Sequence, residues 1–216
     1  MSTASPPLPR TSDGIRTDST LRRVVDVLVA VTALMLLAPA LVVLAALVLV
    51  SSGRPALFRQ VRVGKDGQEF SILKFRTMRA SPVDAPLVSG HADPRITTVG
   101  RVLRRMHVDE LPQLFNLLRG DLTLIGPRPE VPRYVVAYTE TERELLRVRP
   151  GLVGPGALLF TSRAHELDGC ADPEQHYLTA QMHPRLLLDL DYVHNRTVRR
   201  DLSLAWRAAL ACVGHD

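Results

Sequence analysis

Cysteine and aromatic residues are scarce in this 216-residue chain, and their scarcity excludes several classes of protein. The two cysteines, Cys170 and Cys212, lack the number and spacing of a disulfide framework, a thiolate metal site or a redox motif. Aromatic residues make up 5% of the chain and do not alternate with basic residues. A surface that stacks nucleic-acid bases is therefore not expected, and we predict no nucleic-acid partner.

Lysine is almost absent as well. The formal net charge is +5, and Lys65 and Lys74 are the only lysines among 27 basic residues. A basic balance of this kind indicates nucleic acid, a membrane surface or phosphorylated ligands. Because the aromatic pattern argues against nucleic acid, the membrane surface and phosphorylated ligands remain.

Charge is missing from residues 24–50, where Asp26 is the single ionisable residue. A straight helix of this length would measure about 40 Å, which exceeds the ~30 Å hydrocarbon core of a bilayer. The stretch is too long for a signal peptide, and a soluble helix without a polar face would be unusual. The sequence thus predicts a disordered tail over residues 1–20, a membrane-inserted helix over 21–53 and a cytoplasmic domain over 54–216.

Proline near the middle of this apolar stretch bears on its topology. Pro39 removes one helical hydrogen bond and bends the helix axis. Positive charges flank both ends, with Arg22 and Arg23 before the stretch and Arg54 and Arg59 after it. Such flanks do not orient a spanning helix. The residues alone leave two alternatives open, a spanning helix and a re-entrant hairpin with both ends in the cytoplasm.

Two adjacent acids, Asp109 and Glu110, stand within an arginine-rich segment over residues 101–129. Apolar residues at helical spacing predict two short amphipathic helices or one kinked helix, with a new helix starting near the acid pair. In that position the carboxylates can simply cap a helix. Alternatively, the arginines before the pair and Arg128 in a Gly-Pro-Arg-Pro turn after it form a phosphoryl-binding site.

Apolar and charged residues alternate over residues 57–75, with a Gly-Lys-Asp-Gly sequence at 64–67. This pattern predicts a β-hairpin. Its second strand brings Lys74 and Arg76 to one end, where they form either a solvated strand face or phosphate contacts.

A surface helix is expected over residues 133–147, and amphipathic helices are expected from near Pro184 and over residues 202–213. The last two either pack on the core or lie at a membrane interface. The predicted fold class is α+β and mainly helical, with an N-terminal membrane helix, a short β-hairpin and amphipathic interfacial helices.

Ordered motifs run through most of the chain. In order they are Leu57-Phe58-Arg59-Gln60, Lys74-Phe75-Arg76-Thr77-Met78, Asp93-Pro94-Arg95-Ile96-Thr97, Asp109-Glu110-Leu111-Pro112-Gln113-Leu114, Gly126-Pro127-Arg128-Pro129-Glu130 and Arg149-Pro150-Gly151-Leu152-Val153-Gly154. With these motifs the chain resembles the bacterial sugar transferases that act on polyprenyl phosphate, the monotopic phosphoglycosyl transferases. It departs from them at Met106-His107, where small hydroxyl residues are expected, and at Ala38, where many relatives have serine.

The resemblance implies transfer of a sugar 1-phosphate from a UDP-sugar to an undecaprenyl- or decaprenyl-type phosphate, with release of UMP. This reaction would be the initiating membrane step of surface glycan biosynthesis. The resemblance also implies a re-entrant helix broken at Pro39. The protein would then lie in the plasma membrane, or inner membrane, with its catalytic domain on the cytoplasmic face.

The implied mechanism is covalent, with Asp109 attacking the β-phosphorus to form an aspartyl phosphosugar. Asp109 would also hold Mg²⁺, a cation that prefers carboxylate and phosphate oxygens. Glu110 would orient the second nucleophile or help to hold the metal. Arg104 either contacts phosphate or pairs with Glu110. The predicted phosphate contacts are Lys74, Arg76, Arg104 and Arg128.

A membrane-anchored scaffold without enzymatic activity is the alternative function. Its basic domain would bind anionic lipid or an acidic partner. This alternative explains the apolar stretch and the net charge, but not the joint occurrence of the acid pair, Lys74 and the Gly-Pro-Arg-Pro turn. Neither the sugar nor the oligomeric state is predicted.

Overall fold

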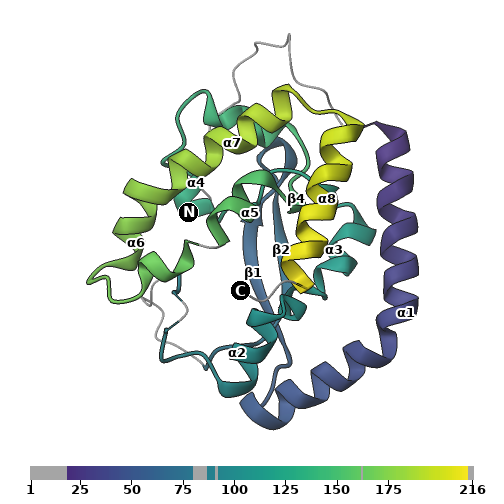
Figure 1. Ribbon diagram of the computed structural model, residues 1–216, viewed down its shortest axis with the longest axis vertical. Coiled ribbons are helices and arrows are strands. Elements are labelled where there is room, and N and C mark those ends of the chain that lie inside the picture. Colours follow the sequence, from purple (N-terminus) through teal and green to yellow (C-terminus); the bar gives the residue numbers. More distant parts are fainter. Residues whose placement is uncertain (1–18, 80–86, 91, 162, 214–216) are drawn as a thin grey trace.

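The computed structural model describes residues 19–79, 87–90, 92–161 and 163–213, and its fold is mainly helical (Figure 1). Two small two-stranded sheets complete it. The expected tail over residues 1–20 lies almost wholly outside the described residues. The elements are α1 (Thr20–Ser52), β1 (Leu57–Val63), η1 (Lys65–Gly67), β2 (Glu69–Phe75), α2 (Thr98–Arg105), η2 (Val108–Glu110), α3 (Gln113–Arg119), β3 (Thr123–Ile125), α4 (Pro132–Val135), η3 (Glu142–Arg147), β4 (Gly151–Val153), α5 (Pro155–Thr161), η4 (Ala164–Leu167), α6 (Pro173–His176), η5 (Tyr177–Met182), α7 (His183–His194) and α8 (Val198–Val213).

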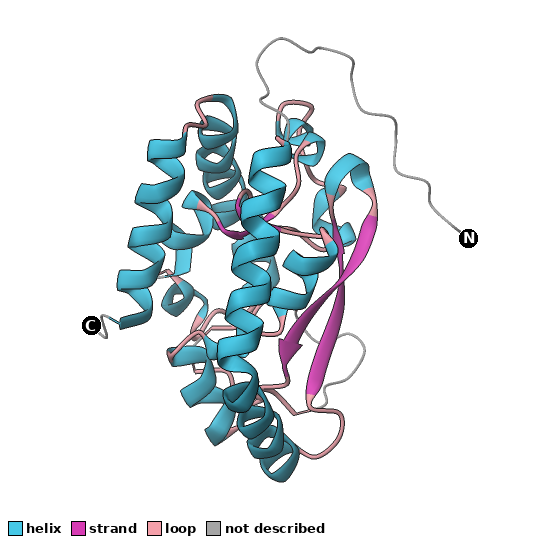
Figure 2. Ribbon diagram, turned by 90° about the vertical axis from the view of Figure 1, so that its right-hand side faces the viewer, coloured by secondary structure: helices cyan, strands magenta, loops and turns pink. Residues whose placement is uncertain are grey.

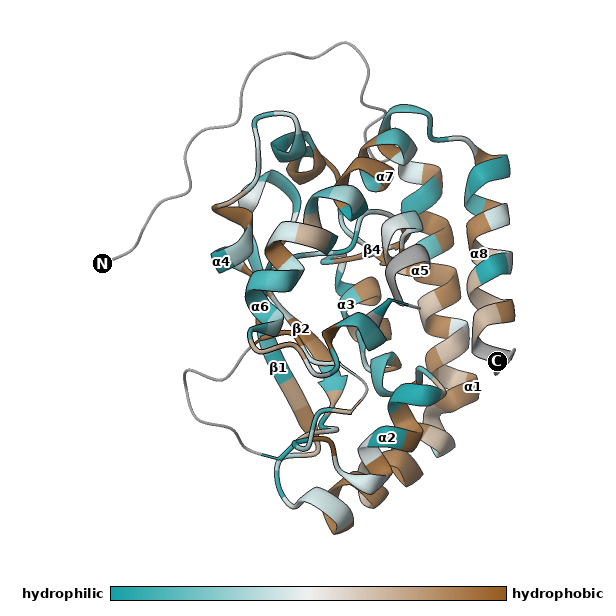
Figure 3. Ribbon diagram, turned by 60° about the vertical axis from the view of Figure 1, so that its left-hand side comes forward, coloured by the Kyte–Doolittle hydropathy of each residue, from teal (hydrophilic) through white to brown (hydrophobic). Residues whose placement is uncertain are grey.

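The apolar stretch forms one helix, α1, which contains Pro39 and changes direction part-way along its length (Figure 1). By length and composition α1 is suited to cross a membrane. The ribbon of α1 in Figure 3 has mostly the colours of hydrophobic residues. Met35 and Leu36, just before the proline, are both 75% exposed. A helix that shows so much apolar surface to its surroundings fits a lipid environment better than water.

Both arms of α1 nevertheless touch the rest of the protein. Before Pro39, Ala30 is fully buried in a cluster with Leu114 and Leu117 of α3. After Pro39, Val48 is fully buried in a cluster with Phe75 of β2 and Leu103 of α2. α1 therefore packs on the rest of the protein at two places. The expected division of the chain at residues 53 and 54 stays a prediction.

The predicted β-hairpin is confirmed. β1 and β2 pair antiparallel from Leu57 opposite Phe75 to Val63 opposite Glu69, and they form the long hairpin along one side of the molecule in Figure 2. The single-turn helix η1 joins them, and Asp66 adopts a left-handed φ of 56° there. Because side chains alternate along a strand, this register fixes the direction in which each side chain of β2 points.

The segment around the acid pair forms two helices, as one of the alternatives predicted, but its details differ. Asp109 and Glu110 lie in a separate 3₁₀ turn, η2, whereas α3 begins at Gln113. A helical turn therefore does start near the acid pair, at Val108 as expected, but the α-helix itself begins only after Pro112. His107 adopts the left-handed conformation and breaks the chain direction before the pair. Pro112 follows the pair as the N-cap of α3, a place where its missing N–H costs nothing.

The structure also contains a second sheet, which the sequence analysis did not predict. β3 and β4 pair in parallel, with Thr123 opposite Gly151 and Ile125 opposite Val153. A Cβ on Gly151 would lie 2.1 Å from the backbone nitrogen of Gly126, so only glycine permits this approach. The glycine-rich sequence after residue 150 thus serves close packing of the backbone here.

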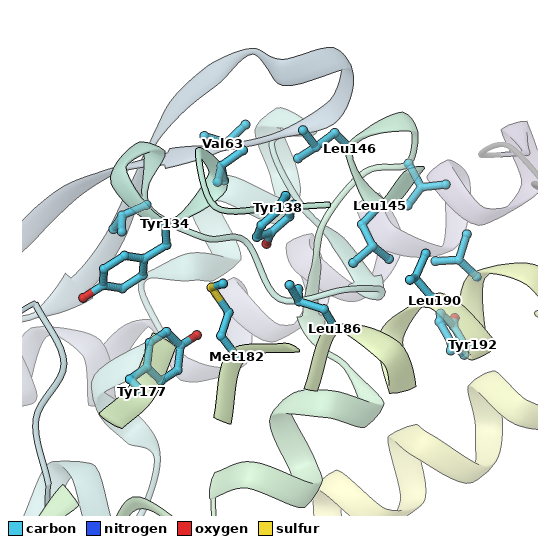
Figure 4. Packing of buried hydrophobic residues seen from close by; sticks show 14 of the residues in the cluster. Val63, Tyr134, Tyr138, Leu145, Leu146, Tyr177, Met182, Leu186, Leu190 and Tyr192 are labelled. Carbon is cyan, nitrogen blue, oxygen red and sulfur yellow. The ribbon is translucent and has the colours of Figure 1, made fainter. Parts of the chain in front are cut away.

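The main core gathers side chains from the hairpin, the short helices and α7 (Figure 4). Tyr134, Leu145 and Leu146 belong to it, so the surface helix expected over residues 133–147 is wrong. That region instead forms the two short pieces α4 and η3, which pack inward. The helices expected near Pro184 and over residues 202–213 are confirmed as α7 and α8.

Candidate active site

Three segments from different parts of the chain meet at Glu110. Lys74 of β2 donates a hydrogen bond from Nζ to Glu110 Oε1 at 2.6 Å, and Arg128, just beyond β3, donates from Nη2 to the same oxygen at 2.8 Å. The side chains of Lys74, Glu110 and Arg128 are 20%, 24% and 28% exposed, so a ligand can reach all three. The structure therefore brings together Lys74, Arg128 and the acid pair, residues that the sequence analysis had singled out.

This pairing decides the charge state of Glu110. Burial acts to raise the pKa of Glu110, but Arg128 and Lys74 more than offset it, so the pKa lies well below its usual range. In turn, Glu110 raises the pKa of Arg128. Burial lowers the pKa of Lys74, and Glu110 opposes that effect. Glu110 is therefore a fixed carboxylate between two cations. Taken together, Lys74, Arg128 and Glu110 carry a net positive charge.

Asp109 has a different environment although it is the neighbouring residue. It is 7% exposed, and within the described part of the chain no side chain or amide donates a hydrogen bond to its carboxylate. Burial raises the pKa of Asp109, while Lys74 lowers it to a smaller extent. The two adjacent acids thus have pKa values shifted in opposite directions. Such a division commonly marks two carboxylates with separate chemical tasks.

Arg104 of α2 lies near Asp109 but is held by hydroxyl groups. Its Nε donates to Thr77 Oγ1 at 2.8 Å, and its Nη1 donates to Ser89 Oγ at 2.9 Å. Its charge still lowers the pKa of Asp109. The alternative pairing of Arg104 with Glu110 is not found among the described residues, because Glu110 pairs with Lys74 and Arg128 instead.

Arg76 lies elsewhere. Its guanidinium donates to the backbone oxygens of Arg54 at 2.9 Å and Gly53 at 3.0 Å, where α1 ends. A cation suits the carbonyl end of a helix, so these contacts stabilise the junction between α1 and the hairpin. A phosphate contact by Arg76 stays a prediction, and the structure does not place Arg76 with the residues around Glu110.

The donor set around Asp109 matches what Mg²⁺ requires only in part. Within the described residues, no group of three histidine, cysteine or acidic side chains could hold a metal ion. Mg²⁺ commonly takes one or two carboxylates and completes its shell with substrate phosphates and water. Asp109 fits that role because its carboxylate is not hydrogen-bonded, whereas Glu110 is already paired with two cations.

The turn that carries Arg128 is held by a buried ionic cluster. Glu130, which is 4% exposed, accepts hydrogen bonds from Arg185 of α7 and from the hydroxyl of Tyr177, the latter at 2.5 Å. Arg62 of β1 adds an ion pair to Glu130 at 3.6 Å and donates to the backbone oxygen of Pro129 at 3.0 Å. Burial acts to raise the pKa of Glu130, but the two arginines outweigh it and lower the pKa.

A comparison with known proteins assigns the chain to a family. Residues 17–215 match the family described as bacterial sugar transferase. The chain belongs to the bacterial sugar transferase family.

Curated relatives of this sugar transferase extend the comparison. The UDP-glucose:undecaprenyl-phosphate glucose-1-phosphate transferase of Caulobacter vibrioides is 36% identical over 97% of this chain and 74% of its own length. The protein of the same name from Escherichia coli K12 is 33% identical over 86% of this chain, but only 39% of its own length is covered. The exopolysaccharide production protein ExoY of Rhizobium meliloti is 35% identical over 86% of this chain and 82% of its own length.

Several residues that hold the site of the transferase were not singled out as site residues from the sequence. Asn116 of α3 is fully buried, accepts a hydrogen bond from the amide of Leu73 at 3.0 Å and donates to the oxygen of Ser71 at 2.8 Å. It thereby ties α3 to the strand that carries Lys74. Glu130 lies within a recognised motif, and Asn116 is a polar residue between the apolar residues Phe115 and Leu117, which were the signals available.

The cluster around Glu130 yields a stability prediction. Arg185→Met should destabilise the transferase by about 3–5 kcal/mol, because it leaves a buried carboxylate without its main partner. Arg200→Met is the matched control, since Arg200 pairs with Asp191 at 2.6 Å on the exposed surface. That control should cost less than about 1 kcal/mol. Thermal unfolding of both variants in detergent, followed by circular dichroism, measures the difference. Equal small losses would contradict the assignment.

Proposed function

We propose that this transferase moves a sugar 1-phosphate from a UDP-sugar to polyprenyl phosphate and releases UMP, as the initiating membrane step of surface glycan biosynthesis. The names of its curated relatives support this substrate pair. The observation that carries the proposal is the different bonding of the two adjacent acids. The carboxylate of Asp109 accepts no hydrogen bond from the described residues, while Glu110 is fixed between Lys74 and Arg128.

The mechanism proposed is a two-step displacement at phosphorus. An oxygen of Asp109 forms a bond to the β-phosphorus of the UDP-sugar as the bond from that phosphorus to the UMP oxygen breaks. An oxygen of polyprenyl phosphate then attacks the same phosphorus, and the Asp109 carboxylate leaves. Splitting the transfer into two steps allows a soluble donor and a lipid acceptor to use the site in turn.

The electrostatics of the site support these roles. Burial weakens the hydration of Asp109 and raises its pKa, which makes its carboxylate a better nucleophile than a solvated one. Lys74 and Arg128, which both pair with the neighbouring Glu110, supply positive charge for the phosphate oxygens. Arg128 forms its hydrogen bond to Glu110 through one of the several N–H donors of a guanidinium, so others remain for phosphate.

Mg²⁺ would be held by Asp109 together with oxygens of the substrate. When bound, the cation would offset the negative charge of the diphosphate. The remaining residues bind and orient the substrate without it. Arg104 would contact a phosphate oxygen with the donors that do not bond Thr77 and Ser89. Glu110 would hold Lys74 and Arg128 in the geometry that receives the phosphate.

A re-entrant α1 completes the proposal. Ala30, before Pro39, and Val48, after it, are both buried against the same domain. A straight spanning helix would take one of these arms to the far side of the membrane, so the two contacts favour a helix that returns to the cytoplasmic face.

We propose that α8 also lies at the membrane, next to α1. Figure 1 places α8 beside α1, and Arg22 pairs with Asp201 of α8 at 3.0 Å. Val198, Leu202 and Trp206 follow one another at intervals of four residues and are each at least 67% exposed. Apolar side chains at this spacing share one helix face and suit the interface of a bilayer.

Release of UMP tests the proposed activity. The full-length transferase, incubated with a panel of UDP-sugars and undecaprenyl phosphate, should release UMP with at least one sugar. Asp109→Asn should reduce turnover by several orders of magnitude, because an amide cannot act as the nucleophile. Asp191→Asn, a change of the same kind in an exposed acid that pairs with Arg200, is the control and should retain activity. A scaffold would release no UMP, and near-normal turnover by folded Asp109→Asn would remove Asp109 from this role.

Labelling of engineered cysteines tests the topology. In a background without Cys170 and Cys212, cysteine placed at position 16 or 59 should resist an impermeant thiol reagent in intact cells. Both should react after lysis, because a re-entrant helix leaves both ends in the cytoplasm. Reaction at position 16 alone in intact cells would establish a spanning helix. Pro39→Ala, which restores a helical hydrogen bond, should shift the protein towards that outcome.

A further inference from the structure

Asp26, the single charge of the apolar stretch, does not face lipid. It is 3% exposed, and both of its carboxylate oxygens bond to β3. Oδ2 accepts a hydrogen bond from Thr123 Oγ1 at 2.8 Å, and Oδ1 accepts one from the amide of Leu124 at 2.9 Å. A carboxylate placed in an apolar helix is costly unless such partners are present, so these two bonds account for its position.

The strand that Asp26 contacts has a free edge. Within the described part of the chain, β3 pairs only with β4, and on that side the Thr123 amide donates to the oxygen of Pro150 at 2.8 Å. The amide of Leu124 points to the opposite edge, where a third strand would normally provide an acceptor. Asp26 provides that acceptor instead, so α1 completes the hydrogen bonding of β3.

β3 leads directly to the Arg128 turn. Ile125 ends the strand, and Arg128 follows three residues later with its hydrogen bond to Glu110. One turn earlier on α1, Arg23 donates to the oxygens of Leu117 and Leu118, both at 2.6 Å. These two carbonyls belong to α3, the helix that follows the acid pair. Residues three apart share one helix face, so α1 holds the segments on both sides of the site with one face.

We propose that Asp26 is a positioning residue through which the membrane helix sets the place of Arg128 relative to Glu110. The anchor is therefore part of the scaffold of the active site. One consequence runs against the usual expectation for a membrane helix. Replacing Asp26 by leucine removes a charge that disfavours insertion, so the variant should bind membrane at least as well as the wild type. It should nevertheless be the poorer enzyme.

The test compares Asp26→Leu with Asp26→Asn and with Val25→Leu, all in the full-length protein in lipid nanodiscs. Asparagine can accept from the Leu124 amide and donate to the Thr123 hydroxyl, so it should preserve the wild-type behaviour. Val25 is an exposed residue of the same helix and serves as the matched control. Hydrogen exchange of the amides over residues 124–128 is one readout, and UMP release is the other.

For Asp26→Leu we expect exchange at residue 124 to accelerate roughly tenfold or more, because a partly buried amide loses its acceptor. We expect kcat to fall roughly ten- to hundredfold, the effect of a slightly displaced phosphate-binding side chain. Because this effect passes through Arg128, Asp26→Leu should cost much less in an Arg128→Lys background. An equal loss in both backgrounds would assign Asp26 to general stability and overturn the proposal.

Two further outcomes are decisive. If Asp26→Leu does not fold, Thr123→Val removes only the hydroxyl, and a smaller loss of the same kind is expected. Wild-type exchange and turnover in Asp26→Leu or in a folded Thr123→Val variant would overturn the proposal. The kinetic readout rests on the proposed function, whereas exchange does not. If the wild type releases no UMP with any UDP-sugar, that function fails, and exchange over residues 124–128 still decides whether Asp26 positions the turn.

Discussion

The double contact of Glu110 with Lys74 and Arg128 is the interaction on which the site depends. It joins a strand of the hairpin, a 3₁₀ turn and the segment after β3, which are distant in sequence. One carboxylate between two cations stabilises all three, because any one of them alone would be a partly buried charge without a partner. The rest of the fold supports these positions, with Asn116 behind β2 and Glu130 behind the Arg128 turn.

The same contact gives Asp109 its character. Lys74 and Arg128 donate hydrogen bonds to Glu110 and not to Asp109, whereas the charge of Lys74 still lowers the pKa of Asp109. Two acids that are equivalent in the sequence thus become different in the fold. A carboxylate that is available, partly dehydrated and adjacent to positive charge suits attack on a phosphate group. The fixed neighbour suits the task of holding the cations in place.

Local patterns predicted what local forces determine. Alternation predicted the hairpin, and helical spacing predicted α7, α8 and the two helices around the acid pair. The pairing of β3 with β4 was not predicted, because nothing in the three residues Thr123–Ile125 indicates a parallel partner at Gly151. Among the charges, the motifs placed Lys74 and Arg128 with the acid pair. They did not reveal that Arg76 holds the end of α1 or that Asp26 faces β3, since side-chain direction follows only from the packed fold.

The availability of Asp109 as a nucleophile is the central claim, and a covalent adduct tests it most directly. The transferase is mixed with its UDP-sugar in the absence of polyprenyl phosphate, quenched rapidly and analysed by intact mass spectrometry and peptide mapping. The proposed mechanism predicts release of about one UMP per active site. It also predicts a mass increase of one sugar phosphate on the peptide that contains Asp109. UMP release only when the lipid phosphate is present, with no adduct at any time, would contradict this account and indicate direct transfer between the two substrates.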